Sequence, residues 1–468
     1  MIRWIALLCT AALFVGCASY PPNPVLDQLD PEYGYRFDNL DAAGNSDSLF
    51  VILTFSGGGT RAAALSYGIL EKLRDTTIEW EGGQRSLLDE VDIISSVSGG
   101  SFTAAYYGLF GQEIFNEFAD AFLYRDIQGA LTGALFSPLN WFKLASPTYS
   151  RIDMAAELYD REIFKGKTFG DLKNVGHRPY LLINATDMTM GSTFAFVQEQ
   201  FDWLCSDLNS VSIARAVAAS SCFPVAFPPM TIDNHSGACS FSEPFWIELA
   251  LEDLQLNPRR FRQAQILRSY LDRADRPYIH LLDGGVADNI GLRGPLAAIR
   301  SNDPEWSILN RINRGKIEKL VVIVVDAKTA AGVRFDRSPK PPGLTKVLTK
   351  ISTVPMDNFS FDTVQALRDT FRNWQNDQRA YDRCRGILEE QCTSAEMPED
   401  PPPQVNFYPI YIGFDQISDS ARRHYFQNMA TSFVLKRKEV DELRSIGPQL
   451  LESSGTFKKL MNSLTGSH

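Results

Sequence analysis

Residues 49–75 read LFVILTFSGGGTRAAALSYGILEKLRD, and three kinds of segment follow one another in this stretch. The apolar run Leu49–Phe55 predicts a β-strand, and the residues after Arg61 have the composition of a helix. Between them, the adjacent glycines Gly57–Gly59 indicate that the backbone bends sharply or comes close to another group. That group would be a phosphate, an oxyanion or another piece of chain, and the order strand, glycine turn, helix is typical of an α/β fold.

The same alternation continues along the chain and predicts an α/β domain with a mostly parallel central sheet. The segment KLVVIVVDAK (319–328) is apolar without alternation, as expected for a strand buried on both faces. The expected strands are Leu49–Phe55, Val91–Val97, Tyr180–Asn184, Tyr278–Leu282 and Leu320–Val325, and the expected helices are Arg61–Asp75, Ser101–Phe110, Ser212–Ala219 and Leu292–Ser301.

Length and composition are those of an ordinary globular protein. The 468 residues are 44% hydrophobic and 22% charged, enough for one large or two medium domains. The net charge of −10 without a basic block argues against nucleic acid as a partner. Neither Cys-x-x-Cys nor paired His spacing is present, so the sequence indicates no metal and no other cofactor.

The first 16 residues have the pattern of a signal peptide. Ile5–Val15 is an apolar run of 11 residues, whereas about 20 are needed to cross a bilayer. The run ends in FVGC, which resembles the bacterial lipobox, so Cys17 is expected to carry lipid such as palmitate. The alternative is a soluble secreted protein that is cut elsewhere. Ala18 after the cysteine favours the outer membrane of the cell envelope by the same resemblance, and residues 17–45 would be a tether.

The predicted main domain covers residues 46–332 and contains an insertion at 111–169. The insertion includes LTGALFSPLNWFKLASP (131–147), which is rich in large apolar residues. It is either a lid or interfacial element that contacts lipid, or a set of core helices, and both alternatives stay open. Residues 333–468 begin with Pro-rich loops and contain the strand-like segment QVNFYPIYIGF. We expect them to form a C-terminal extension that packs on the sheet.

Five cysteines remain once Cys9 and Cys17 are set aside, and the envelope permits disulfides. Cys384 and Cys392 are close in sequence and form the preferred pair. Cys205 with Cys239 is the second choice, since spacing alone does not fix connectivity.

A second motif, DIISSVSGGSFTAAYYG (92–108), joins a predicted strand to a predicted helix through a serine and two glycines. A serine at such a tight turn is a nucleophile elbow, which pushes the side chain of Ser98 out of the sheet. Small neighbours are required for steric reasons. Gly100 meets this need, and Ser96 stands where glycine is usual.

A third motif, HLLDGGVADNIGL (280–292), places Asp283 at the end of a predicted strand, followed by Gly284 and Gly285. Open α/β folds keep their reactive groups in the crevice beyond such strand ends. In a parallel sheet, therefore, this carboxylate and the serine of the second motif would converge on one edge.

Together the motifs suggest acyl transfer. Ser98 would attack an ester carbonyl and Asp283 would take its proton as general base. Arg61 would fix the glycine loop or add positive potential. The oxyanion would be held by the backbone N–H groups of Gly57, Gly58 and Gly59.

The order of GGGTR, SVSGG and DGG along the chain resembles the patatin-like phospholipase family. TFGDL (168–172) with INATDMTMG (183–191), and ARAVAASSCFPVAFPPM (214–230), resemble its central region and its Pro-rich substrate loop. The resemblance runs from Leu49 to Ala297. It implies a three-layer α/β/α fold, a Ser–Asp dyad without His, and ester bonds of phospholipids or lysophospholipids as substrates. Ser56, Ala62 and Ser96 depart from the family pattern and affect the loop geometry rather than the reaction class.

Three alternative functions are compatible with parts of the sequence. GGGTRA also matches the dinucleotide fingerprint Gly-x-Gly-x-x-Ala, but a nucleotide-binding oxidoreductase leaves Ser98 and Asp283 unexplained. The others are a catalytically inactive lipid-binding lipoprotein and a serine peptidase. A fluorophosphonate probe would label neither of the first two. His280 lies three residues before Asp283 on the same strand and should point to the opposite face, which favours a dyad over a triad.

Overall fold

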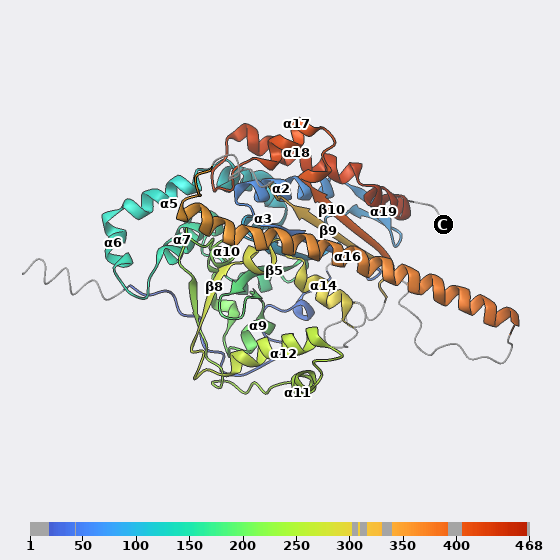
Figure 1. Cartoon of the computed structure of the whole chain (residues 1–468), viewed down its shortest axis with the longest axis horizontal. Helices are drawn as coiled ribbons and strands as arrows, with labels where there is room; N and C mark the ends of the chain where they lie inside the picture. Colours follow the sequence, from blue (N-terminus) through green and yellow to red (C-terminus); the bar gives the residue numbers. More distant parts are fainter. Residues whose placement is uncertain are drawn as a thin grey trace, which may run out of the picture.

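The structure is a computed structural model of the chain, and it describes residues 18–42, 44–301, 308, 316–329, 339–391 and 405–465. An eight-stranded sheet lies at its centre, with helices on both faces (Figure 1). This confirms the predicted α/β class. In spatial order the strands are β10 (Asn406–Gly413), β9 (Lys319–Asp326), β1 (Leu49–Phe55), β4 (Val91–Val97), β5 (Tyr180–Asp187), β8 (Tyr278–Asp283) and β7 (Met230–Asp233), and β6 (Ser192–Ala195) pairs with β5.

The five strands from β10 to β5 are parallel, and their carboxyl ends meet at one edge. Phe55 at the end of β1 pairs with both Val325 of β9 and Ser96 of β4. Val97 at the end of β4 pairs with Asn184 of β5. Every residue of β1 and β4 is buried, as continuous apolar runs covered by helices on both faces require.

The rest of the sheet is antiparallel, which corrects the expectation that Asp283 reaches the site on a parallel strand. β8 runs antiparallel to β5 and pairs with it only over Ala185–Asp187. β8 therefore runs toward the carboxyl ends of the parallel strands from the opposite direction, and it ends at them. Its last residue, Asp283, pairs with Ala185, which directly follows the Asn184 that pairs with Val97. The carboxylate thus meets the serine at the predicted edge for a different geometric reason.

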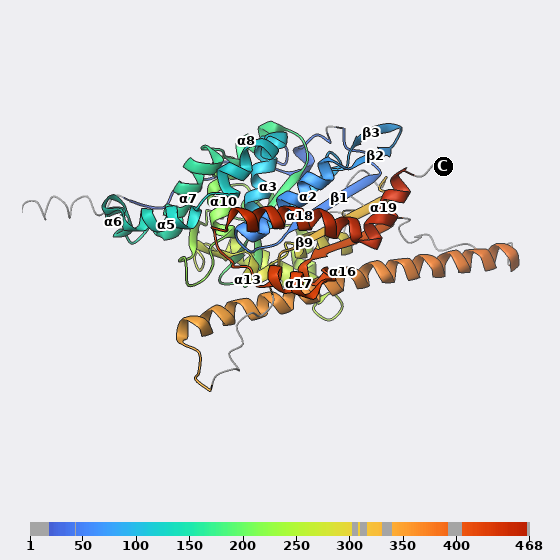
Figure 2. The same cartoon turned by 90° about the horizontal axis from the view of Figure 1, so that it is seen from above.

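Helices on the two sides of the sheet come from distant parts of the chain. α2 (Thr60–Arg74) packs against α3 (Gly99–Phe110) and α18 (Arg437–Ser453). The 48-residue α16 (Leu344–Gln391) packs against α13 (Gly285–Asp288), α14 (Arg293–Arg300) and β10, and crosses the outside of the molecule as one long rod (Figures 1 and 2). None of the helices in the described part of the chain is long and apolar enough to span a membrane.

The predicted C-terminal extension adds a strand to the sheet. β10 pairs with β9 along its whole length and forms the outer edge. Pro409 within β10 is compatible with this position, because an edge strand has one side on which no amide donor is needed. α18 and α19 (Gly455–Thr465) then pack on the core.

The predicted insertion at 111–169 divides into two parts. Phe118, Phe122 and Tyr159 are buried in the aromatic core, as the core-helix alternative expected. By contrast, α5 (Ile127–Phe136) and α6 (Pro138–Leu144) project at one end of the molecule and carry large exposed apolar side chains (Figure 1).

The segment expected to be a tether is packed on the domain over its described residues. The Tyr35 side chain is 1% exposed, its hydroxyl accepts the Leu181 N–H at 2.7 Å, and its ring stacks on Tyr180. The Asn23 side chain donates to Ser206 at 2.8 Å. The polar, Pro-rich composition suggested a linker, but scattered aromatic and amide side chains provide enough contacts to order it.

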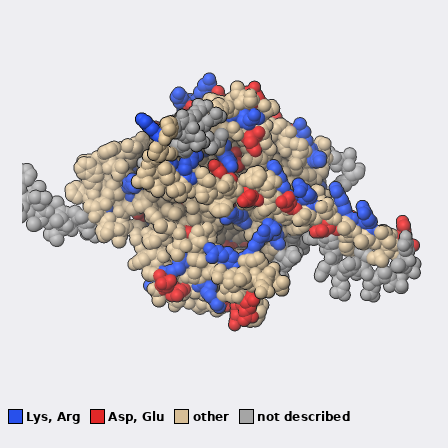
Figure 3. All heavy atoms as spheres, in the orientation of Figure 1, with Lys and Arg blue, Asp and Glu red and all other residues tan. Residues whose placement is uncertain are grey.

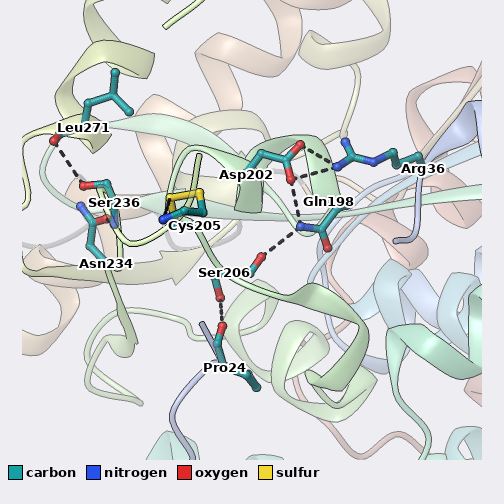
Figure 4. The surroundings of a disulfide bond; sticks show 10 residues. Pro24, Arg36, Gln198, Asp202, Cys205, Ser206, Asn234, Ser236 and Leu271 are labelled. Atoms are coloured by element: carbon teal, nitrogen blue, oxygen red, sulfur yellow. Dashed lines mark hydrogen bonds and ion pairs between the residues drawn. A yellow bond between two sulfur atoms is a disulfide. The ribbon is translucent and has the colours of Figure 1, made fainter. Parts of the chain in front are cut away.

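A disulfide joins Cys205 and Cys239, so the second-choice pairing is the one observed (Figure 4). Beside it, the Ser206 hydroxyl donates to the Pro24 carbonyl, and Arg36 pairs with Asp202 at 2.8 Å (Figure 4). The preferred pairing of Cys384 with Cys392 is not observed, since Cys384 is a free, exposed thiol. Its expected partner, Cys392, lies outside the described residues.

Candidate active site

Ser98 occupies the turn between β4 and α3 with φ +50° and ψ −119°. Such a positive φ is strained for a residue with a side chain, as is typical of a nucleophile elbow. The next residue must be glycine, because a Cβ on Gly99 would lie 2.1 Å from the Gly59 carbonyl oxygen. Gly100 follows in the first turn of α3, close to the end of β1. Ser96 is buried and donates to the Leu182 carbonyl at 3.3 Å, so this departure from glycine is accommodated.

Asp283 lies close to this serine, so that the Ser98 side chain lowers the pKa of its carboxyl, and both residues line one cavity. The Gly285 N–H donates to the Oδ1 atom of Asp283 at 2.8 Å, and the Gly284 N–H donates to the Ser220 carbonyl. Burial raises the pKa of Asp283 to about 7, and the hydrogen bonds from Gly285 and Ser98 lower it in part. A carboxylate that titrates near neutrality is suited to accept and return a proton.

The glycine loop differs from the expectation at one position. The Gly57 N–H donates to the backbone carbonyl of Asn289 at 2.9 Å, so this amide is not available to an oxyanion. The N–H groups of Gly58 and Gly59 have no acceptor among the residues that the structure describes. The predicted three donors are therefore reduced to two in this structure.

Arg61 is buried and holds the loop in place. Its guanidinium donates to the carbonyls of Ala327 and Met429, both at 2.9 Å. Burial lowers the pKa of Arg61 to about 10, and the nearby Asp326 raises it in part. Of the two predicted roles, the geometry favours fixing the loop, because the guanidinium donates to two backbone carbonyls.

Two residues that sequence reasoning missed support the site. The Ser220 hydroxyl accepts the Ser98 N–H at 2.8 Å and donates to the Asn184 carbonyl at 2.7 Å, which ties the elbow to β5. Asn289 holds the glycine loop through its carbonyl. Ser220 lies in the ARAVAASSCFPV patch and Asn289 lies six residues after Asp283, but no spacing rule assigns either residue a partner.

A cavity of about 720 Å³ opens above the serine and the aspartate. Ser98, Asp283 and the three glycines form part of its wall. Its other walls come from α5, α7 (Arg151–Tyr159), the Pro-rich loop, α16 and the segment after α17 (Ser420–Gln427). Large apolar side chains and several cations line it. The large apolar residues are Leu131, Leu135, Met154, Phe223, Phe227, Met356, Met429 and Phe433, and the cations besides Arg61 are Arg151, Lys328 and Lys350.

No histidine within the described ranges lines this cavity. His280 is exposed on β8, where it contacts the Thr231 hydroxyl at 3.1 Å, while Asp283 on the same strand is buried. Across the described residues, no group of three or more His, Cys, Asp or Glu side chains could hold a metal ion.

The fold and these contacts define a class, an α/β/α protein with an elbow serine paired to a buried carboxylate. A model of the patatin-like phospholipase family matches residues 53–296, more than half of the chain. The chain belongs to the patatin-like phospholipase family, and the match confirms the family resemblance. Membership supports lipid acyl hydrolase activity.

Solved structures with similarity to the chain include human GIVD cytosolic phospholipase A2, at 14% identity over 89% of this chain and 60% of that chain, with a TM-score of 0.39. The same human protein in complex with methyl γ-linolenyl fluorophosphonate matches at 14% identity over 89% and 59%, with a TM-score of 0.38. VipD from Legionella pneumophila matches at 12% identity over 91% and 71%, with a TM-score of 0.27. The chain thus spans about 60% of the length of the human enzyme. No curated protein sequence matches.

Proposed function

We propose that the chain is a serine acyl hydrolase that cleaves carboxylic esters of lipids through a Ser98–Asp283 dyad. The observation that carries this proposal is the position of the elbow serine Ser98 beside the buried Asp283, whose pKa burial raises to about 7, in the wall of one cavity.

In the proposed reaction, the Ser98 Oγ attacks the ester carbonyl and Asp283 takes the hydroxyl proton. The backbone N–H groups of Gly58 and Gly59 hold the tetrahedral oxyanion. Collapse of this intermediate breaks the ester bond, and Asp283 returns the proton to the leaving alcohol. A water molecule that Asp283 deprotonates then attacks the acyl-enzyme. The bond from the acyl carbon to the Ser98 Oγ breaks, the fatty acid leaves, and Asp283 returns the proton to the Ser98 Oγ.

The cavity supports phospholipids or lysophospholipids as the substrate class. Its apolar side chains suit an acyl chain, because burial of methylene groups stabilises the complex. Arg151 of α7 and Lys350 of α16 also line the cavity and suit an anionic phosphate. We also propose that Cys17 is lipidated and that the protein is anchored to a bacterial envelope membrane, the outer membrane being favoured by Ala18.

The test uses the full chain with Ser98→Ala and Asp283→Asn, and Ser66→Ala as a matched control. Ser66 is a buried serine of α2 whose hydroxyl has no partner among the described residues, so its removal should preserve folding and activity. We expect both dyad variants to lose at least about 1,000-fold in kcat/KM on a lipid ester, in line with removing a catalytic nucleophile or base. Ser98→Ala should also lose labelling by a fluorophosphonate.

Folded dyad variants that keep full esterase activity would disprove the dyad. A wild-type protein that releases no fatty acid from any defined lipid would support the catalytically inactive lipid-binding alternative. Faster cleavage of peptides than of esters would instead indicate a peptidase.

A further inference from the structure

The exposed hairpin of α5 and α6 has an unusual surface for a globular protein. Phe136 and Leu139 are 68% and 79% exposed, and Trp141 and Phe142 are exposed as well. From residue 127 to residue 144 the only charged side chain is Lys143. Figure 3 shows this end of the molecule with almost no charged atoms. Contiguous exposed apolar patches of this kind mark binding surfaces.

The beginning of α16 presents a second apolar face. Five exposed side chains recur at a helical spacing of three and four residues, so they lie on one side of the helix. They are Leu344, Val347, Leu348, Ile351 and Val354. Lys346 and Lys350 fall on the other side of the helix, together with Thr349 and Thr353, and the first acidic residue is Asp357. A helix with one exposed apolar face is typical of elements that lie in the headgroup region of a bilayer.

Both apolar faces border the candidate active site. Residues of α5, including Leu131 and Leu135, line the cavity from one side. Thr349, Lys350 and Thr353 of α16 line it from another, on the side of the helix away from the exposed apolar face. In both Figure 1 and Figure 2, α5, α6 and the start of α16 lie at the same end of the molecule.

The N-terminal segment reaches the same end. The Ser146 hydroxyl, two residues after the end of α6, donates to the Ala18 carbonyl. The Tyr20 N–H donates to the Thr148 carbonyl at 2.8 Å. Cys17 is bonded directly to Ala18, so an acyl group on Cys17 would start within a few ångströms of this contact.

We propose that α5, α6 and residues 344–354 of α16 form one docking face for a lipid bilayer, through which a lipid substrate passes into the cavity. This inference rests on the proposed function and adds the route by which the substrate reaches the site. The apolar side chains insert between the lipids, and the substrate enters the cavity between α5 and α16.

The first experiment separates bilayer substrate from soluble substrate. Full-length protein with Leu139→Glu or Ile351→Glu acts on vesicles of phosphatidylethanolamine and phosphatidylglycerol, and on p-nitrophenyl butyrate in solution. Leu256→Glu is the matched control, because Leu256 is 84% exposed in the loop between α11 (Phe245–Glu252) and α12 (Pro258–Leu271), away from this face (Figure 1). We expect each face variant to lose at least tenfold on vesicles and less than twofold on the soluble ester. The control should lose less than twofold on both.

The second experiment locates the surface without relying on activity. Tryptophan fluorescence of the full chain is measured in vesicles that contain brominated acyl chains, which quench only inserted tryptophans. Trp141→Phe should remove at least half of the quenching while keeping the face apolar. Trp80→Phe should remove none, because the Trp80 indole donates to Ser48 elsewhere on the protein.

Equal vesicle rates for the face variants and Leu256→Glu would overturn the proposal, as would quenching that Trp141→Phe leaves unchanged. A face that instead seats a second copy of the chain would show Leu139→Glu converting a dimer to a monomer, and this too would overturn it. If the wild type hydrolyses no ester but Trp141 is quenched, the proposed function fails and the docking face stands.

Discussion

Replacing Asp283 with asparagine should make the protein increasingly more stable than the wild type as the pH rises. The carboxylate is buried, and burial raises its pKa to about 7 from an ordinary value of 3.8. The native protein therefore keeps this proton up to about pH 7, whereas the unfolded chain loses it near pH 4. Because the native state binds more protons in between, the free energy of unfolding falls as the pH rises through this window. The amide of an asparagine cannot ionise, so the Asp283→Asn variant lacks this loss.

The size of the effect follows from the two pKa values. A difference of about three pKa units, at about 1.36 kcal/mol per unit, costs the wild type about 4 kcal/mol at pH 7 and above. At pH 5 the same relation gives about 1.7 kcal/mol. The advantage of Asp283→Asn should thus grow by about 2.5 kcal/mol between pH 5 and pH 8. Any change in packing at this position contributes equally at both pH values and cancels in this comparison.

The assay is urea unfolding followed by tryptophan fluorescence at pH 5, 6, 7 and 8. Asp377→Asn, at an exposed position of α16, is the control and should follow the wild type at every pH. In parallel, the kcat/KM of the wild type on an ester should rise with pH to a plateau with a midpoint near 7, because only the ionised carboxylate accepts the Ser98 proton. Wild-type and Asp283→Asn curves that stay parallel from pH 5 to pH 8 would refute the buried, protonated carboxylate.

Two further predictions concern the loop and the disulfide. Gly59→Ala should lower stability by about 2–4 kcal/mol and impair ester hydrolysis, because Gly59 has φ +60° and its Cβ would lie 2.3 Å from the Ser432 carbonyl oxygen. Gly82→Ala, with φ +71° but open space around it, should cost only about 1 kcal/mol in the same urea titration; equal losses would contradict the steric argument. The double variant Cys205→Ser, Cys239→Ser lacks a disulfide whose cysteines are 34 residues apart in the sequence, and its free energy of unfolding should be lower by about 2–4 kcal/mol. Cys384→Ser should change nothing, and an unchanged unfolding midpoint in the double variant would contradict the pairing.

The strands that frame the site were predictable because their cause is local. β1 is a continuous apolar run that ends at the glycine turn, and β4 is a buried run that ends at the elbow serine. The bounds of both strands therefore follow from the amino-acid sequence alone. The same holds for the placement of Ser98, since a serine between a buried strand and small residues has few other structural explanations.

The direction of β8 was not predictable, because a short strand has the same sequence pattern whether it pairs parallel or antiparallel with its neighbour. Its pairing with β5 covers only three residues, and it depends on where segments about a hundred residues apart come together. The occupied amide of Gly57 was hidden for a similar reason. Its acceptor, the carbonyl of Asn289, lies more than two hundred residues further along the chain.

The C-terminal part of the chain determines the shape of the site even though it lies beyond the residues that the family model matches. The Ser432 carbonyl accepts the Thr60 N–H at 2.9 Å at the start of α2, and the Met429 carbonyl accepts from Arg61. These contacts fix the C-terminal end of the glycine loop, which lines the cavity. Because α16 and residues 427–433 also supply much of the cavity wall, we expect the proposed dyad chemistry and the choice of lipid to depend on different parts of the chain. Substitutions of the cavity-lining residues of α16, such as Thr353, should therefore change which ester is preferred while leaving fluorophosphonate labelling of Ser98 intact.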